Sequence, residues 1–121
     1  MVTVTLPWPN RDLHPNARVH FMRKARAAKK ARHDAQWAAQ AAGVRHIEAK
    51  GLEVTVTFHP PSNHRRDVDG LLSNVKSYLD GISDVCGVDD SKWSIKPLRG
   101  SVVKNGEVRV LIQPIEEEAA A

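Results

Sequence analysis

Hydrophobic and polar residues alternate along two stretches of the chain, and this period of two predicts β-strands. The first stretch is VTVTL at residues 2–6. The clearer one is LEVTVTFH at residues 52–59, where one face is expected to be buried. Between them, PWPNRDLHPN at residues 7–16 is dense in proline and asparagine, which predicts a loop, and we expect it to face a bound partner.

The segment from Val19 to Ala42 changes to a helical period. One side of this predicted helix is rich in alanine and suits close packing against a sheet, and Gly43 suits its end. The other side is basic and would either stay in solvent or contact phosphates, while Arg32 falls among the apolar positions without an explanation. The apolar side comprises Phe21, Ala25, Ala28, Ala35 and Ala39, and the basic side comprises Arg23, Arg26, Lys29, Lys30 and His33.

A second helix is predicted over residues 68–80, with Gly81 after its end. Asn105-Gly106 is a favoured two-residue turn, and it predicts a hairpin between a strand near 98–104 and one at 107–113. The apolar stripe of the second helix would comprise Leu71, Leu72, Val75 and Leu79.

The order of these elements is β-α-β-α-β-β, which predicts an α/β (α+β) fold with a small mixed β-sheet and two helices packed against it. A chain of 121 residues suits one domain. We place this domain at residues 1–115 and expect a disordered tail at 116–121, with the sequence EEEAAA.

Composition narrows the class of protein. No uncharged apolar run is long enough for a bilayer, the N-terminus does not resemble a secretion signal, and the single Cys86 fits a reducing cytosol, so we expect a cytoplasmic protein without a membrane partner. The net charge is +4 although three glutamates crowd the tail, and this basic balance favours a polyanionic partner. We expect Trp8, Trp37 and Trp93 to serve packing or an interface rather than base stacking.

The residues best suited to chemistry are Asp67, Asp69, Lys76 and the pair Asp89-Asp90. Aspartates separated by one residue can reach a shared cation, and Mg²⁺, or Mn²⁺ in its place, prefers such carboxylate oxygens. We therefore predict Asp67, Asp69 and Asp90 as the metal ligands, with Asp89 as the alternative in the loop. Lys76 follows Asp69 by about two helical turns and would stabilise a phosphate transition state.

Basic residues close to this cluster would hold neighbouring phosphates without reading their sequence. The predicted DNA contacts are His64, Arg65, Arg66, Asn16, Arg18, Arg23, Arg26 and Lys30. Ordinary structural roles remain open for the acidic groups: an N-cap for Asp67 or Asp69, a surface ion pair for Lys76 with Asp80, and turn chemistry for Asp89-Asp90.

In these motifs the chain resembles the RusA family of Holliday-junction resolvases, the crossover junction endodeoxyribonucleases of bacteria and their phages. The resemblance spans nearly the whole sequence, from the Leu6-Pro7-Trp8-Pro9 opening through Arg65-Arg66-Asp67-Val68-Asp69 to Val88-Asp89-Asp90-Ser91. It implies a Mg²⁺ site of Asp67, Asp69 and Asp90, a catalytic Lys76, and a homodimer that nicks opposing strands of a four-way junction. No small-molecule cofactor is implied.

The chain departs from the family pattern at two positions. Asparagine commonly follows the second aspartate, where this chain has Gly70, and the family lysine commonly lies at the position of Ser73, one helical turn before Lys76. The expected function is a Mg²⁺-dependent, structure-selective endonuclease in recombination, repair or phage genome processing. The alternative is a catalytically weak junction-binding or DNA-binding protein. An RNA-binding module is less favoured because the chain has few aromatic residues.

Overall fold

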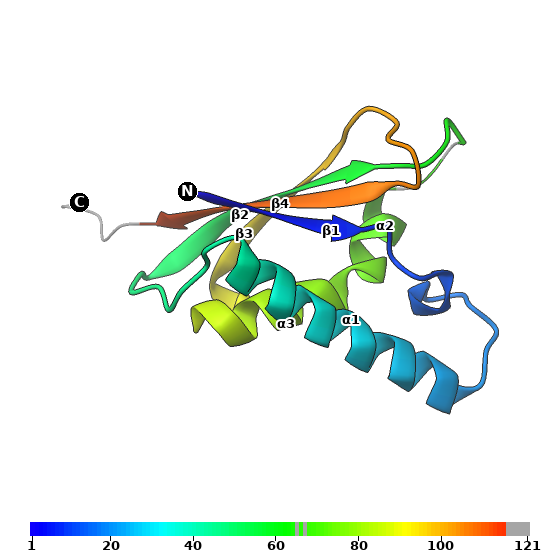
Figure 1. Cartoon of the computed structure of the whole chain (residues 1–121), viewed down its shortest axis with the longest axis horizontal. Coiled ribbons are helices and arrows are strands. Elements are labelled where there is room, and N and C mark those ends of the chain that lie inside the picture. Colours follow the sequence, from blue (N-terminus) through cyan, green and yellow to red (C-terminus); the bar gives the residue numbers. More distant parts are fainter. Residues whose placement is uncertain (65, 67, 116–121) are drawn as a thin grey trace.

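Figure 1 shows the computed structural model, which describes residues 1–64, 66 and 68–115, with Asp69 described by its backbone alone. The predicted tail, 116–121, lies outside the described residues. The elements in chain order are β1 (Val2–Pro7), the 3₁₀ helix η1 (Arg11–Leu13), α1 (Phe21–Ala41), β2 (Gly51–His59), α2 (Val68–Asn74), α3 (Lys76–Cys86), the 3₁₀ helix η2 (Asp90–Lys92), β3 (Trp93–Arg99) and β4 (Glu107–Ile115).

The four strands form one mixed sheet in the order β1-β4-β2-β3. Strand β4 runs antiparallel to both β1 and β2, whereas β3 runs parallel to β2. A parallel pair needs a crossover connection, and α2 and α3 supply it. The register aligns Val4 with Val110 and Val110 with Val56, and all three are fully buried. The predicted class, a small mixed sheet with helices packed against it, is confirmed.

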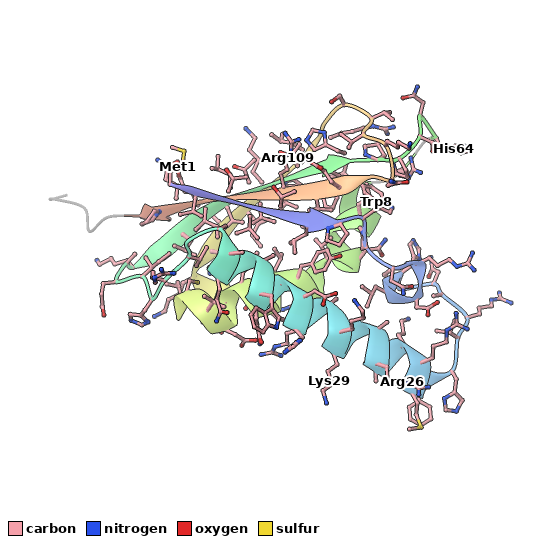
Figure 2. The ribbon with its side chains drawn as sticks, in the orientation of Figure 1. Met1, Trp8, Arg26, Lys29, His64 and Arg109 are labelled. Carbon is pink, nitrogen blue, oxygen red and sulfur yellow. The ribbon has the colours of Figure 1, made fainter. Side chains whose placement is uncertain are left out.

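Helices α1 and α3 lie together on one side of the sheet, and Arg109 projects from the other side (Figures 1 and 2). Alternation along β2 buries Leu52, Val54, Val56 and Phe58 beneath the helices. The last turns of α1 meet this layer through alanines because short side chains allow close approach. The buried alanines are Ala31, Ala35 and Ala39.

The C-terminus of α1 is closed by Gly43, as predicted. Gly43 has a φ of 93°, its N–H donates to Gln40 O, and the N–H of Val44 donates to Ala39 O. This pair of bonds satisfies carbonyls that the helix end would otherwise leave unpaired, and it turns the buried Val44 into the core.

The first half of α1 contradicts the predicted apolar face. Phe21 is 74% exposed and Ala25 is exposed as well, because the N-terminal turns of α1 extend past the edge of the sheet (Figure 1). The predicted stripe therefore contacts the core only from its middle onward.

The predicted second helix is in fact two helices, which meet at Val75. Val75 has φ −102° and ψ 9°, so α2 ends at Asn74 and α3 starts at Lys76. Gly81 was predicted to follow the helix, which is wrong: it is buried within α3, and Gly87, at φ 77°, caps the helix. A Cβ at Gly81 would lie 2.2 Å from Arg32 O, so glycine permits the close contact of α3 with α1.

The contact of α3 with α1 also explains why Arg32 falls among the apolar positions of α1. Its Nε and Nη2 donate to the two carboxylate oxygens of Asp84, both at 2.7 Å, and Gln36 Nε2 donates to Asp84 Oδ2 at 2.7 Å. The guanidinium lowers the pKa of the Asp84 carboxyl, which in turn raises the pKa of Arg32. The charged pair joins α1 to α3 at their solvent edge.

The predicted hairpin is also wrong, although its turn is present. Asn105 and Gly106 both have positive φ, 66° and 73°, as the sequence suggested. However, β3 spans Trp93–Arg99 and pairs with β2, while β4 inserts between β2 and β1. Pro97 is tolerated in β3 because this strand is at an edge of the sheet.

Among the described residues, no helix is long and apolar enough to cross a membrane.

Candidate active site

Lys76, the first residue of α3, is held between two carboxylates. Its Nζ donates to Asp80 Oδ1 and to Asp90 Oδ2, each at 2.6 Å. Asp80 follows one turn later on α3, whereas Asp90 comes from η2, just before β3. The hydrogen bonds from Lys76 to Asp80 and then to Asp90 raise the pKa of the lysine, so its ammonium form is favoured. The predicted pair with Asp80 is present, and Asp90 is brought to the same ammonium group.

The loop between α3 and β3 is fixed by contacts to Val88. Its carbonyl accepts hydrogen bonds from Ser83 Oγ and from the indole Nε1 of buried Trp93, both at 2.9 Å. Burial raises the pKa of the neighbouring Cys86 thiol, which is packed in the core. These contacts hold the following acidic residues at a defined position.

Asp89 and Asp90 have different partners in this loop. Asp89 caps η2: its Oδ2 accepts from the backbone N–H of Ser91 at 3.1 Å and from the Ser91 hydroxyl. Hydrogen bonds from Ser91 lower the pKa of the Asp89 carboxyl. Asp90 instead faces Lys76, so Asp89 has the turn role considered above and Asp90 is the carboxylate directed at the predicted catalytic lysine.

Two predicted metal ligands cannot be placed. Asp67 lies outside the described residues, and Asp69 is described only as a backbone position within α2. Among the described side chains, no group of three His, Cys, Asp or Glu residues is close enough to hold a metal ion. Of the three residues Asp67, Asp69 and Asp90, only Asp90 has a side chain that the structure describes.

Asp90 lies beside an ammonium group and an open hollow. Its carboxylate is about one-third exposed and offers oxygen donors, and a cation is already its partner, the ammonium group of Lys76. A hollow of about 520 Å³ adjoins it between the helices and β3. The hollow is lined by Leu72, Ser73, Lys76, Leu79, Asp90 and Ile95.

Several of the predicted DNA contacts on α1 have protein partners. Arg23 Nε donates to the buried Asp12 at 2.8 Å, and Lys30 Nζ donates to Asp34 at 2.6 Å. Arg26 and Lys29 point away from the sheet into solvent (Figure 2). For Arg26, as for the exposed Asn16 side chain and for Arg18, no protein partner is seen in the part of the chain that the structure describes.

The loop after β2 carries the remaining predicted contacts, of which Arg65 lies outside the described residues. His64 is at the exposed tip of this loop (Figure 2). Arg66 folds back: its Nη1 donates to Ser62 O at 3.0 Å and to His64 O at 3.1 Å, and its guanidinium lies over the Trp8 ring at 5.6 Å. Arg66 therefore braces its own loop and joins it to the start of the N-terminal loop.

A second hollow, which the sequence did not predict, lies on the other side of α2. Its volume is about 610 Å³, and it separates the N-terminal loop from α2. The sequence predicted that residues 7–16 face a bound partner. It did not predict that α2 lies across the hollow from this loop. The lining residues include Trp8, Arg11, His14, Arg66, Leu71 and Asn74.

Taken together, the fold and site define a single α+β domain with a lysine–carboxylate cluster at the α2–α3 junction, flanked by basic loops. No family model matches the sequence. The chain is 39% identical over 124 residues to an uncharacterized protein of Xylella fastidiosa (strain Temecula1), an alignment that covers 99% of this chain and 81% of that protein. The chain belongs to the same family as this Xylella protein.

Proposed function

We propose that the protein is a Mg²⁺-dependent, structure-selective DNA endonuclease that nicks four-way junctions in the manner of the RusA resolvases. Its setting would be recombination, repair or phage genome processing in a bacterial cytoplasm. The observation that carries the proposal is the contact of Lys76 with Asp90. These residues come from α3 and η2, and the motif resemblance assigns both to one active site.

The basic balance of the chain supports a DNA substrate. The formal net charge is +4, and exposed cations occur on the N-terminal loop and on α1. Contacts of this kind position a phosphate backbone and depend strongly on salt. Arg18 and Arg26 are the best placed of the predicted arginines and lysines because neither has a protein partner among the described residues.

The proposed chemistry divides between carboxylates and lysine. Asp90, with Asp67 and Asp69, would hold Mg²⁺, which when bound supplies charge stabilisation at the scissile phosphate and lowers the pKa of water. Lys76 remains protonated because two carboxylates favour its ammonium form, so it would offer a positive charge to the phosphate rather than act as a base. Binding of a cation by Asp90 would release Lys76 from one of its two partners.

A homodimer is part of the same proposal. A four-way junction has approximate two-fold symmetry, and two active sites related by a dyad could cut opposing strands. The exposed Phe21, Met22 and Trp37 on α1 are apolar groups that an assembly could cover.

The contacts of Lys76 also favour a second candidate function, a junction-binding protein with weak catalytic activity. Lys76 is occupied by two carboxylates, and Ser73 stands where the family commonly has lysine. A protein that binds junctions but cuts them poorly would have these features. Tight, salt-sensitive binding without metal-dependent nicks would select this alternative.

The role of Asp90 is tested by comparing Asp90→Asn with Asp84→Asn. Both remove one carboxylate from a charged pair, but Asp84 lies at the α1–α3 contact. We expect Asp90→Asn to lower the rate of junction cleavage by about a hundredfold or more and to leave junction binding in EDTA intact. Asp84→Asn should cleave at nearly the wild-type rate. Equal rates for wild type and Asp90→Asn would reject the proposed site.

A further inference from the structure

The hollow between the N-terminal loop and α2 is separate from the Lys76 cluster. It lies beside Gly70, Leu71 and Asn74 of α2, whereas the hollow beside Lys76 involves Leu72 and Ser73. Its volume of about 610 Å³ is in the range of small-molecule sites. The two hollows therefore flank α2 on different sides.

Asn74 borders this hollow and carries an unsatisfied polar atom. It is only 8% exposed, and its Oδ1 is a buried side-chain oxygen without a hydrogen-bond partner within the described part of the chain. Leaving such an oxygen unpaired costs about 1–3 kcal/mol. The Asn74 side chain borders the hollow, so a rotation of its amide would present this oxygen to a hydrogen-bond donor on a bound molecule and remove the cost.

The opposite wall is cationic and partly aromatic. Arg11 is exposed, and His14 accepts the Asn16 N–H at its Nδ1, which leaves Nε2 to carry the ring proton. Trp8 contributes apolar surface to this wall, as Leu71 does on the α2 side, and the Arg66 guanidinium lies over the Trp8 ring. A flat polar ring with an attached phosphate matches this combination better than a purely apolar ligand does.

The geometry points to a site for one unpaired nucleotide: its base enters the hollow and bonds to the Asn74 amide, while its phosphate contacts Arg11 and His14. This inference rests on the proposed function for its substrate, DNA. Nucleotides at a junction or bulge are the ones available to leave the stack, because extrusion costs least where pairing is already lost. The site would thus favour branched over linear DNA.

The test measures the affinity of the full chain for two DNA probes in EDTA, without cleavage. One probe is a short duplex with a single unpaired adenine, and the other is the same duplex without it. We expect wild type to bind the bulged duplex about tenfold more tightly, the effect of one buried base contact. Asn74→Leu, which matches asparagine in heavy-atom count, should abolish this preference and leave affinity for the paired duplex unchanged.

Two further variants control for folding and for nonspecific effects. Gln113→Leu makes the same kind of amide-to-leucine change at an exposed position of β4 and should keep the wild-type preference. Arg11→Ala should weaken the preference even if Asn74→Leu fails to fold. Asn74→Leu itself should melt no lower than wild type, because it removes an orphaned buried oxygen.

The outcomes separate this inference from the proposed function. No bulge preference in wild type, an unchanged preference in Asn74→Leu, or binding to neither probe would overturn the nucleotide site. If Mg²⁺-dependent junction cleavage persists without the preference, the endonuclease proposal stands and the site falls. A bulge preference lost in Asn74→Leu, in a protein that never cuts junctions, would support the site and reject the endonuclease.

Discussion

At the scale of single residues, the partner of each charged group decides its role. Lys76 and Asp80 have the spacing of an ordinary helix ion pair, and the sequence already suggested it. The arrival of Asp90 at the same Nζ could not be derived from spacing along α3, because η2 and α3 meet only through the fold of the intervening loop. The sequence offered no role for Arg32, and the structure shows that it forms an ion pair with Asp84.

Tyr78 provides a prediction at this scale because it is the only tyrosine in the sequence. It is buried, its hydroxyl donates to Pro7 O at 2.9 Å, and burial followed by the negative charge of Asp34 raises its pKa to about 12. We expect the tyrosinate absorbance of the native protein to rise with a midpoint near pH 12, against about 10 in urea.

The sign of the linked stability change follows from this pKa. The folded state holds the phenolic proton more tightly than the unfolded state, so the stabilisation is fully present below about pH 10 and is lost as the pH rises through 12. Tyr78→Phe should show neither the absorbance change nor this contribution to alkaline unfolding. A native midpoint near pH 10 would show that Tyr78 is not buried as described.

At the scale of elements, period and turn chemistry predicted β1, β2 and α1 with the Gly43 cap. The break at Val75 could not be predicted, because Leu71, Val75, Tyr78 and Leu79 are buried at spacings that a continuous helix would also give. The predicted hairpin failed for a similar reason. Asn105-Gly106 determines a local turn, whereas the insertion of β4 between β1 and β2 depends on pairing between distant segments.

The contact of α1 with α3 yields a second prediction. Gly81→Ala should lower the free energy of unfolding by about 1–3 kcal/mol, because the added Cβ would lie 2.2 Å from Arg32 O and 2.8 Å from Ala35 Cβ. Urea unfolding measures this change. Ser77→Ala on the same helix is the control and should alter stability by no more than about 0.5 kcal/mol.

A rise in the free energy of unfolding of Gly81→Ala would contradict this account. Alanine usually stabilises a helix relative to glycine by about 0.4–1 kcal/mol when space is available. A stabilised Gly81→Ala variant would therefore mean that α1 and α3 do not approach as closely as the structure indicates.

At the scale of the whole molecule, the sequence predicted the α+β class, and the family resemblance assigned to one site Lys76 and Asp90, which the fold brings into contact. It could not predict the hollow beside Asn74, because that space is enclosed by the N-terminal loop and α2, which are distant along the chain. The basic residues predicted on α1 fall into two groups, those paired with aspartates and those facing solvent. Arg23 and Lys30 are paired with Asp12 and Asp34, while Arg26 and Lys29 face solvent.

The central claim, that this domain cuts branched DNA with Mg²⁺, is tested most directly by a cleavage assay. A mobile four-way junction and a linear duplex of matched sequence would be incubated with the protein in Mg²⁺ and in EDTA, for wild type and Asp69→Asn. Symmetric nicks on the junction alone, lost in EDTA and in the variant, are the predicted result. Salt-sensitive binding without nicks, or full-rate cleavage by Asp69→Asn, would contradict the account.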